Sequence, residues 1–402
     1  MTTADRPLTI LCLSSYFKGN RFLETCKREG ARVILLVRQD VLDKPWARDA
    51  CDEVHAMPSL ADPRDLQNAV SYLARTRPID RVAPLDDYDV MAAAGLRQHL
   101  CLPGTDEGEA RRFRDKLTMR VEARRAGVAV PEFVPIFHHA DVARFLDEVP
   151  PPWMLKPRAE AASIGIRKLE RAADVWRAIE ALGDLQSYYL LERFVEGDVF
   201  HVDGVVEGGE VAFAEAHGYL RPLFQIAHEG GVFATRTLPR DDPFTLALLE
   251  AHRRLVGALR LRRGVTHTEF IRGKADGAIY FLETAARAGG AHITDLVEEV
   301  AGVDLWAEWA RLELYLGERP FRPRPRRGGY GGLLLSLARQ ERPDTSAYAD
   351  PEIVRRFDVP NHVGFVLRAD SAARVEDLMR QYVPRIQADF QATLPPLGTQ
   401  RT

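Results

Sequence analysis

The chain has 402 residues, of which 46% are hydrophobic and 28% charged, and its formal net charge is −3. A chain of this length can bury several cores, and we expect a globular protein of roughly two to four structural units. The near-neutral charge gives no overall attraction to nucleic acid or to an anionic membrane surface. No apolar run approaches the roughly 18 residues of a membrane span, so neither nucleic acid nor membrane is expected as a partner.

Cysteine usage and the first residues indicate a cytoplasmic protein. The four cysteines form no C-x-x-C pair and no zinc-binding spacing, which fits a reducing compartment. The apolar run 8–13 is too short for the hydrophobic part of a secretion signal. An arginine- and proline-rich stretch at 319–327 is interpreted as a solvated linker rather than as a binding site for an acidic partner.

Buried strands and helices alternate through the first quarter of the chain. In order, the expected elements are strand 8–13, a helix ending near 29, strand 33–37, strand 54–56, helix 63–75 and strand 80–84. This alternation predicts a parallel sheet. Asp86, Asp87 and Tyr88 follow the last strand, at the edge where such sheets usually bind ligands.

Several common nucleotide-binding and hydrolytic sequence patterns are missing. The turn after the first strand has no G-x-G-x-x-G, which argues against a dinucleotide-binding domain. No G-x-x-x-x-G-K-[ST], G-x-S-x-G or H-E-x-x-H occurs in the chain. P-loop kinases, serine hydrolases and common zinc proteases are therefore not the leading interpretations.

The rest of the chain alternates between short strands and helices of mixed order, which predicts α+β units. The expected helices are 111–126, 172–182, 244–259, 293–316 and 373–382. The expected strands are 132–136, 153–156, 166–169, 188–192, 199–206, 210–216, 267–271, 278–283, 331–337 and 362–367. Four units are predicted, with boundaries at 1–110, 111–185, 186–317 and 328–402.

Two lysines occupy positions that suit phosphate binding. Lys116 lies near the start of a helix, and Lys156 ends an apolar strand ahead of the loop 158–165. That loop contains Ser163 and Gly165, so its backbone N–H groups could close over phosphates. The alternative interpretation is two surface lysines and an ordinary hairpin loop.

The hairpin that turns through 274–277 carries two acidic residues. If Ile271 pairs with Ile279, Glu269 and Glu283 become diagonal neighbours on one face. Two carboxylates so placed repel each other without a cation, and Mg²⁺ typically takes one or two carboxylates together with water and phosphate oxygens. The alternative is two solvated acids on an exposed face.

An arginine follows this hairpin. Arg287 comes four residues after Glu283 and just before Gly289 and Gly290. Its bidentate fork could hold a transferring phosphoryl group or a substrate carboxylate. As an alternative, Arg287 is a solvated loop residue.

Taken in order, these pieces resemble the ATP-grasp superfamily from the first strand to about residue 311. The matching segments are Arg114-Asp-Lys116 with 126–131, Trp153-Met-Leu-Lys-Pro157 with 163–166, Leu190-Leu-Glu192 with 195–197 and 202–204, and His267-Thr-Glu269 with 280–283 and 287–290. One such match is common by chance, whereas four in the right order are not.

The resemblance implies an ATP-grasp fold of α/β and α+β parts. An N-terminal parallel-sheet domain would precede two α+β subdomains that clamp ATP, followed here by a small C-terminal α+β cap. Lys116 and Lys156 would bind ATP phosphates, Glu269 and Glu283 would bind Mg²⁺ or a substituting Mn²⁺, and Arg287 would act in catalysis with Lys156. The other implied nucleotide contacts are Ser163, Glu192, Val195 and Asp198.

Three positions depart from the family pattern. Ala285 stands where the family usually has an asparagine as a third metal contact, and Val199 where many members have a glutamate that binds the ribose. Asp198 is adjacent and could replace that glutamate. In the phosphate loop, Ala161 and Ala162 take the place of the usual glycines.

The predicted function is an ADP-forming carboxylate–amine ligase that makes a dipeptide or an amino-acid conjugate through an acyl phosphate. The segments after Gly289 look most like stand-alone amino-acid ligases, and a homodimer is a state that the resemblance also implies. The candidate substrate contacts are His217, Tyr219, Arg221, Arg236 and Gly290. Two alternatives stay open: an ATP-grasp carboxylase that activates bicarbonate, and a nucleotide-binding module without turnover.

Overall fold

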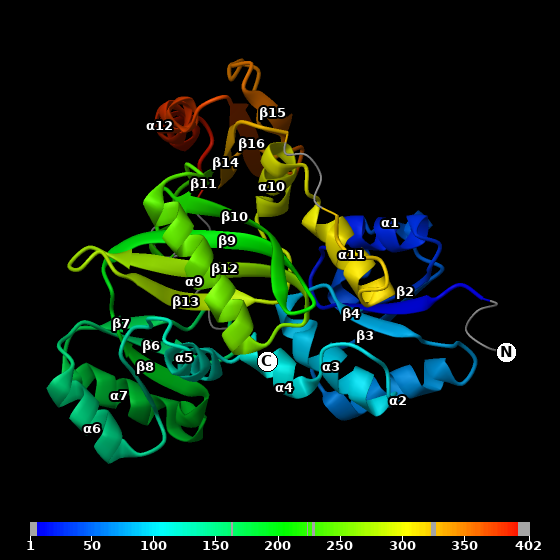
Figure 1. The fold of residues 1–402 in the computed structure, drawn as a ribbon, viewed down its shortest axis with the longest axis horizontal. Coiled ribbons are helices and arrows are strands. Elements are labelled where there is room, and N and C mark those ends of the chain that lie inside the picture. Colours follow the sequence, from blue (N-terminus) through cyan, green and yellow to red (C-terminus); the bar gives the residue numbers. More distant parts are fainter. Residues whose placement is uncertain (1–5, 162–163, 223, 227–229, 323–326, 393–402) are drawn as a thin grey trace.

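The computed structural model of the chain describes residues 6–161, 164–222, 224–226, 230–322 and 327–392 (Figure 1). Its strands form three sheets, whose strand orders are β3-β2-β1-β4, β5-β8-β6-β7 and β13-β12-β9-β10-β11-β14-β16-β15. This arrangement confirms the predicted combination of an N-terminal parallel-sheet domain with α+β parts.

The first sheet is parallel throughout. Its strands and helices are β1 (Thr9–Ser14), α1 (Asn20–Arg28), β2 (Arg32–Arg38), β3 (Glu53–Met57), α2 (Pro63–Ala74), β4 (Arg81–Pro84) and α3 (Val90–His99), with short 3₁₀ turns at Gln39–Val41, Arg48–Ala50 and Asp87–Asp89. Every residue of β1 is buried, as expected for a strand that has neighbours on both sides and helices on both faces. Asp62 caps α2 and Pro63 occupies its first turn, a combination that satisfies free N–H groups at a helix start.

The second sheet is antiparallel and lies below the central sheet in Figure 1. Its strands and the helices around it are α4 (Glu107–Arg112), α5 (Lys116–Arg125), β5 (Phe133–Pro135), α6 (His139–Glu148), β6 (Trp153–Pro157), β7 (Arg167–Leu169), α7 (Ala172–Leu182) and β8 (Tyr189–Arg193), with a 3₁₀ helix at Gly183–Tyr188. Apolar side chains of α6 and α7, such as Phe145 and Ile179, pack on Trp153 and Leu191 of the strands. The sheet thus includes β8, which follows the predicted boundary at 185.

The third sheet is the centre of the molecule, and all its neighbouring strands are antiparallel. Its strands and helices are β9 (Gly197–Glu207), β10 (Glu210–Tyr219), β11 (Phe233–Thr237), α9 (Pro243–Leu259), β12 (Arg263–Gly273), β13 (Ile279–Ala285), α10 (Ile293–Ala301), α11 (Leu305–Tyr315), β14 (Tyr330–Leu337), β15 (Ile353–Arg356), β16 (His362–Ala369) and α12 (Ala372–Asp389). The C-terminal strands therefore extend the central sheet, because β14 pairs with β11.

Two predicted long helices are each divided in the structure. The stretch 111–126 splits into α4 and α5 because the Asp115 side chain accepts hydrogen bonds from the backbone of Leu117 and Thr118 and so begins a new helix. The stretch 293–316 splits at Gly302, whose φ of 72° ends α10, and Asp304 then caps α11. In both places a capping aspartate inside an apparently continuous pattern sets the break.

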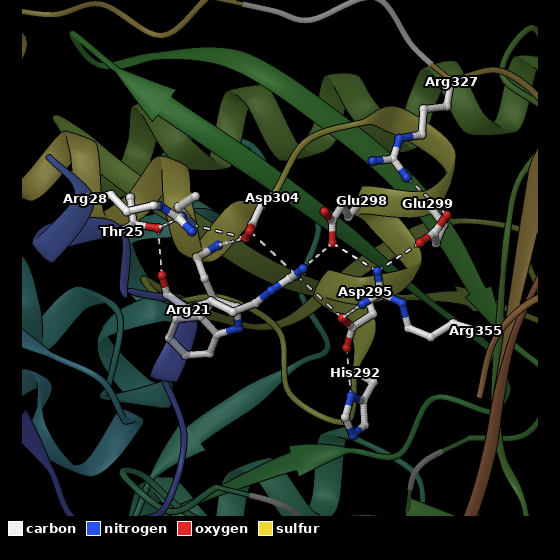
Figure 2. A network of polar contacts seen from close by, with 12 residues as sticks. Arg21, Thr25, Arg28, His292, Asp295, Glu298, Glu299, Asp304, Arg327 and Arg355 are labelled. Carbon is white, nitrogen blue, oxygen red and sulfur yellow. Dashed lines mark hydrogen bonds and ion pairs between the residues drawn. The ribbon is translucent and has the colours of Figure 1, made fainter. Parts of the chain in front are cut away.

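Ion pairs join the N-terminal sheet, the central region and the C-terminal strands (Figure 2). Asp295 and Glu298 of α10 contact Arg21 of α1, at 3.5 and 2.7 Å. Arg355 of β15 contacts Asp295 and lies 2.9 Å from Glu299. Helix α10 is therefore an acidic connection between two basic partners from distant parts of the chain.

Within the described ranges, no helix combines the length and the apolar character that crossing a membrane requires.

Candidate active site

Lys116 meets the acidic hairpin, 167 residues further along the chain. It is the first residue of α5, and its side chain is largely buried. Its Nζ lies 2.9 Å from Glu283 Oε2 and donates a hydrogen bond of 2.6 Å to the backbone oxygen of Glu160. Burial opposes the charge of Glu283, but Lys116 and Lys156 lower the pKa of this carboxyl below its ordinary value.

Lys156 lies next to the last residue of β6 and forms an ion pair with Glu192 of the neighbouring strand β8. Arg120 Nε lies 3.0 Å from the other oxygen of Glu192, and both partners are almost completely buried. Burial alone would raise the pKa of Glu192, but Arg120 and Lys156 lower it. The Glu192 side chain is thus engaged in holding Lys156, and its implied nucleotide contact stays a prediction.

Arg120 was not among the predicted site residues. It also donates to the backbone oxygen of Leu282, beside the predicted metal ligand Glu283. The one signal in the sequence is spacing, because residues four apart lie on the same helix face. Arg120 therefore shares its face of α5 with Lys116.

The acidic hairpin pairs in a different register from the predicted one. Ile271 lies opposite Tyr280, not Ile279, and Glu269 lies directly opposite Glu283 rather than diagonally. The cause is a bulge at Leu282 together with a tighter turn. Since successive side chains alternate between faces, Glu283 would point away from Glu269 without the extra residue. The bulge thus keeps the two carboxylates on one face.

Arg287 reaches the edge of the N-terminal sheet. Its Nε donates a hydrogen bond of 2.6 Å to Asp87 Oδ2, and Nη1 donates one of 2.8 Å to the backbone oxygen of Ala288. Asp87 follows β4, where a ligand-binding edge was predicted. Burial raises the pKa of Asp87, but Arg287 and Arg114 bring it below the ordinary value. The acidic hairpin and the edge of the parallel sheet therefore meet at Arg287.

The phosphate loop can be followed only in part, because Ser163 lies outside the described residues and its predicted role stays a prediction. The preceding residues lie beside Lys116: Arg158 pairs with Asp115, and Glu160 accepts a hydrogen bond of 3.0 Å from Tyr88 Oη. The loop is thus anchored both to α5 and to the N-terminal sheet.

Three positions of the nucleotide segment, Val195, Asp198 and Val199, lie at or just before the start of β9. Val195 and Val199 are buried in a small apolar cluster with Tyr219 and Ile271. Asp198 is exposed at the start of β9. The structure thus leaves Asp198 accessible and encloses Val199, and a ribose contact by Asp198 stays a prediction.

One face of the central sheet carries a row of polar side chains across five strands. Paired residues place Glu283, Glu269, His201, His217 and Thr237 next to one another in this order. Of the predicted substrate residues, Tyr219 donates a hydrogen bond of 2.9 Å to Glu269 Oε1. His217 is fully buried, and neither of its ring nitrogens has a hydrogen-bond partner among the described residues.

Arg236, another predicted substrate residue, is directed away from these carboxylates. Arg236 pairs with Gly218, so its side chain lies on the opposite face of the sheet from His217, and its Nη2 is 3.0 Å from Glu376 of α12. Gly290 has open space around it. The predicted substrate role of Arg221 stays a prediction.

The sequence prediction did not include His201 and Asp203. Both lie on β9, the strand that pairs with the strand of Glu269. His201 Nδ1 is 2.6 Å from Asp203 Oδ2, and His267 Nδ1 is 2.9 Å from Asp203 Oδ1. Burial lowers the pKa of His201 to about 3, whereas Asp203 and Glu269 outweigh burial and raise the pKa of His267 to about 10. Polar residues at alternate positions of a buried strand, His201 and Asp203, were the signal for this cluster.

Comparisons with known proteins agree with this architecture. The family model described as the ATP-grasp N-terminal domain matches residues 23–104. The L-arginine-specific L-amino acid ligase of Bacillus subtilis is 23% identical over 277 residues, which are 67% of this chain and 65% of that protein. The alanine–anticapsin ligase of Bacillus subtilis is 26% identical over 253 residues, 56% of this chain and 52% of that protein.

A solved structure is similar over nearly the whole chain. The L-amino acid ligase from Bacillus licheniformis superposes with a TM-score of 0.75 at 18% sequence identity, covering 97% of this chain and 99% of that one. The matches to the two curated relatives span between about half and two thirds of those proteins. Fold, family model and ordered sequence segments agree: the chain has the ATP-grasp fold, and its residues 23–104 match the ATP-grasp N-terminal domain.

Proposed function

We propose that this chain is an ATP-dependent ligase that joins the carboxylate of one amino acid to the amine of a second and releases ADP and phosphate. The observation that carries the proposal is the convergence of Lys116, Glu283 and Arg287 at the junction of the N-terminal sheet, α5 and the central sheet. The names of the relatives, an L-arginine-specific L-amino acid ligase and an alanine–anticapsin ligase, support this substrate class. Small amino-acid substrates, a cytoplasmic location and a homodimer belong to the same proposal.

The two acidic residues fit a magnesium ion. One oxygen of each is held by the protein, since Tyr219 donates to Glu269 Oε1 and Lys116 faces Glu283 Oε2. The described contacts leave the second oxygen of each carboxylate for a cation. Mg²⁺ typically takes one or two carboxylates and completes its shell with water and phosphate oxygens, and Mn²⁺ suits the same ligands. When bound, such an ion neutralises charge on the nucleotide phosphates.

The lysines supply fixed positive charge for the phosphates of ATP. Lys116 is held between Glu283 and the backbone of Glu160, and Lys156 is held by Glu192. Because their positions are set before the nucleotide arrives, little reorganisation is needed during phosphoryl transfer. Positioning of this kind accounts for most of the rate enhancement in such reactions.

Arg287 is placed to hold the reacting carboxylate. Asp87 and the backbone of Ala288 orient its guanidinium, and its remaining N–H groups can bind substrate oxygens in a planar fork. In the proposed reaction a carboxylate oxygen attacks the γ-phosphorus and ADP leaves. The amine then attacks the acyl carbon, phosphate leaves, and the amine loses a proton.

A screen of phosphate release tests the proposal. Purified protein is incubated with ATP and Mg²⁺ and with amino acids singly and in pairs, including L-arginine because of the relative named for it, and products are identified by mass. Release that depends on amino acids, with a product equal to their joined mass minus water, supports the ligase. Release that needs bicarbonate but no amino acid would indicate a carboxylase, and nucleotide binding without release under any condition would indicate a binding module.

A further inference from the structure

A buried hydrogen-bonded cluster lies next to Glu269 on the same face of the central sheet. Asp203 of β9 is fully buried and accepts hydrogen bonds from two histidines, His201 at 2.6 Å and His267 at 2.9 Å. His201 also contacts Thr235 Oγ1 at 2.8 Å, and its ring stacks on that of His217 with centroids 4.7 Å apart. Burying a charged carboxylate such as that of Asp203 is costly unless it is fully paired. Stability alone therefore does not explain why this cluster is buried.

The arrangement is a hydrogen-bond network rather than a second metal site. The ligand atoms of His201, Asp203 and His267 lie within 4.8 Å of one another, as in a metal site. However, bonds of about 2.0–2.1 Å to a tetrahedral metal separate its ligand atoms by about 3.3 Å, whereas the two histidines approach Asp203 to 2.6 and 2.9 Å. Nδ1 of each ring is directed at the Asp203 carboxylate itself, which leaves no room for a metal between the rings and the carboxylate.

The network fixes the orientation of the His267 ring. With Nδ1 directed at Asp203, Nε2 faces Glu269 Oε1 at 3.6 Å. Tyr219 Oη reaches the same oxygen at 2.9 Å from β10, which is separated from β12 by β9. Glu269 Oε1 is therefore held from two sides, which sets the direction of the second oxygen.

The loop that carries Arg287 is packed against the same cluster. A side chain at Gly289 would place its Cβ 2.9 Å from Asp203 Oδ1 and 3.2 Å from His267 Nδ1. Only a residue without a Cβ lets the backbone pass at this distance. Asp203 and His267 thus lie against the segment after Arg287, and His267 is on the same strand as Glu269.

We propose that Asp203 is a positioning residue that, through His267, orients the Glu269 carboxylate toward the metal–nucleotide. This inference rests on the proposed function, because it assigns Glu269 to the metal. Hydrogen-bond partners behind a metal ligand typically change metal affinity by about 10–100-fold when they are replaced. The Asp203 network is expected to act in the same way.

Binding of Mn²⁺ in the presence of ADP, measured by electron paramagnetic resonance on the full chain, tests the inference without turnover. Asp203→Asn is expected to weaken Mn²⁺ binding about 10–100-fold, with ADP affinity in the absence of metal unchanged. His252→Asn is the matched control, because His252 is equally buried but contacts Thr266 Oγ1 on the opposite face of β12. This control is expected to bind Mn²⁺ like the wild type.

If D203N does not fold, His267→Gln carries the same test, since its amide can still donate to Asp203 but cannot reach Glu269 as the ring does. Equal Mn²⁺ affinity in the wild type and in the folded variant would overturn the inference alone. Absence of Mn²⁺–ADP binding in the wild type would overturn the proposed function and this inference together.

Discussion

Glu283 links the two halves of the proposed site, because one oxygen faces Lys116 and the other is the one proposed to bind the cation. Glu283→Gln keeps the shape of the side chain and removes its charge, so both interactions weaken. We expect Mg²⁺-dependent ADP formation to fall by about 100-fold or more, measured by coupled ADP release. Glu250→Gln is the control, since Glu250 forms only an exposed pair with Arg253. Activity of the Glu283 variant within about twofold of the control would contradict the assignment.

Individual site residues were predictable to different degrees. Lys116, Glu269 and Glu283 stand in ordered segments typical of a family, and the structure brings them to one place. Arg120 and Asp203 gave weaker signals, because a buried charge is identified by its partners, and those partners come from other elements. The face of Arg236 depends on the pairing of β10 with β11, which no local pattern shows.

At the scale of elements, the pairing of β9 with β12 holds the polar row of the central sheet in place. Gly197 opens this pairing, and a Cβ there would lie 2.0 Å from the backbone oxygen of Arg272. Since that atom belongs to the backbone, it cannot easily move aside. Gly197→Ala is expected to destabilise the protein by about 1–3 kcal/mol, measured by urea unfolding.

A second glycine provides the matched control for this substitution. Gly257 lies inside α9, and a Cβ there would meet nothing within 4 Å. Gly257→Ala is expected to stabilise the protein by about 0.4–1 kcal/mol, because alanine restricts the unfolded chain and favours the helix. A Gly197 variant as stable as the wild type would show that the two strands are not paired as described.

The hairpin of Glu269 and Glu283 shows where sequence reasoning at this scale ends. The turn residues and alternating apolar positions correctly predict two strands, but a bulge adds a residue to one strand without a composition that marks it. The predicted register was therefore wrong, even though the two acids do share a face. The division of two long helices follows from Asp115 and Asp304, whose capping role was overlooked.

At the scale of the whole molecule, Asp295 connects three regions (Figure 2). Burial raises the pKa of Asp295, but His292, Arg355 and Arg21 lower it below the ordinary value of 3.8. A lowered carboxyl pKa contributes stability that is complete above the ordinary value and is lost as pH falls through the folded-state value. The stability from Asp295 is thus expected at neutral pH and to disappear below about pH 4.

Asp295→Asn is expected to lower the free energy of unfolding by about 1–3 kcal/mol at pH 7, and this difference from the wild type should shrink below about pH 4. Thermal unfolding at a series of pH values measures it. Asp377→Asn is a suitable control, because Asp377 pairs with Arg380 on the exposed side of α12. A difference that stayed constant into acid would contradict the role given to the ion pairs.

The connection of the C-terminal strands to the central sheet was also beyond the sequence. β14 pairs with β11, but Tyr330 follows Thr237 by more than ninety residues. The sequence correctly predicts β14 and β16 as strands. Their attachment to the central sheet is a long-range pairing, for which the sequence has no local signal. That attachment makes α10 and β15 neighbours and so creates the Asp295 network.

The proposed ligase reaction moves an oxygen atom from substrate to phosphate, and this transfer can be measured directly. A carboxylate oxygen that attacks the γ-phosphorus stays with phosphorus when the amine attacks the acyl carbon and the C–O bond breaks. An amino acid labelled with ¹⁸O in its carboxylate is supplied with ATP, Mg²⁺ and the accepting amino acid, and released phosphate is analysed by mass spectrometry. Phosphate carrying one ¹⁸O is predicted; formation of the amide with unlabelled phosphate would contradict the acyl-phosphate route.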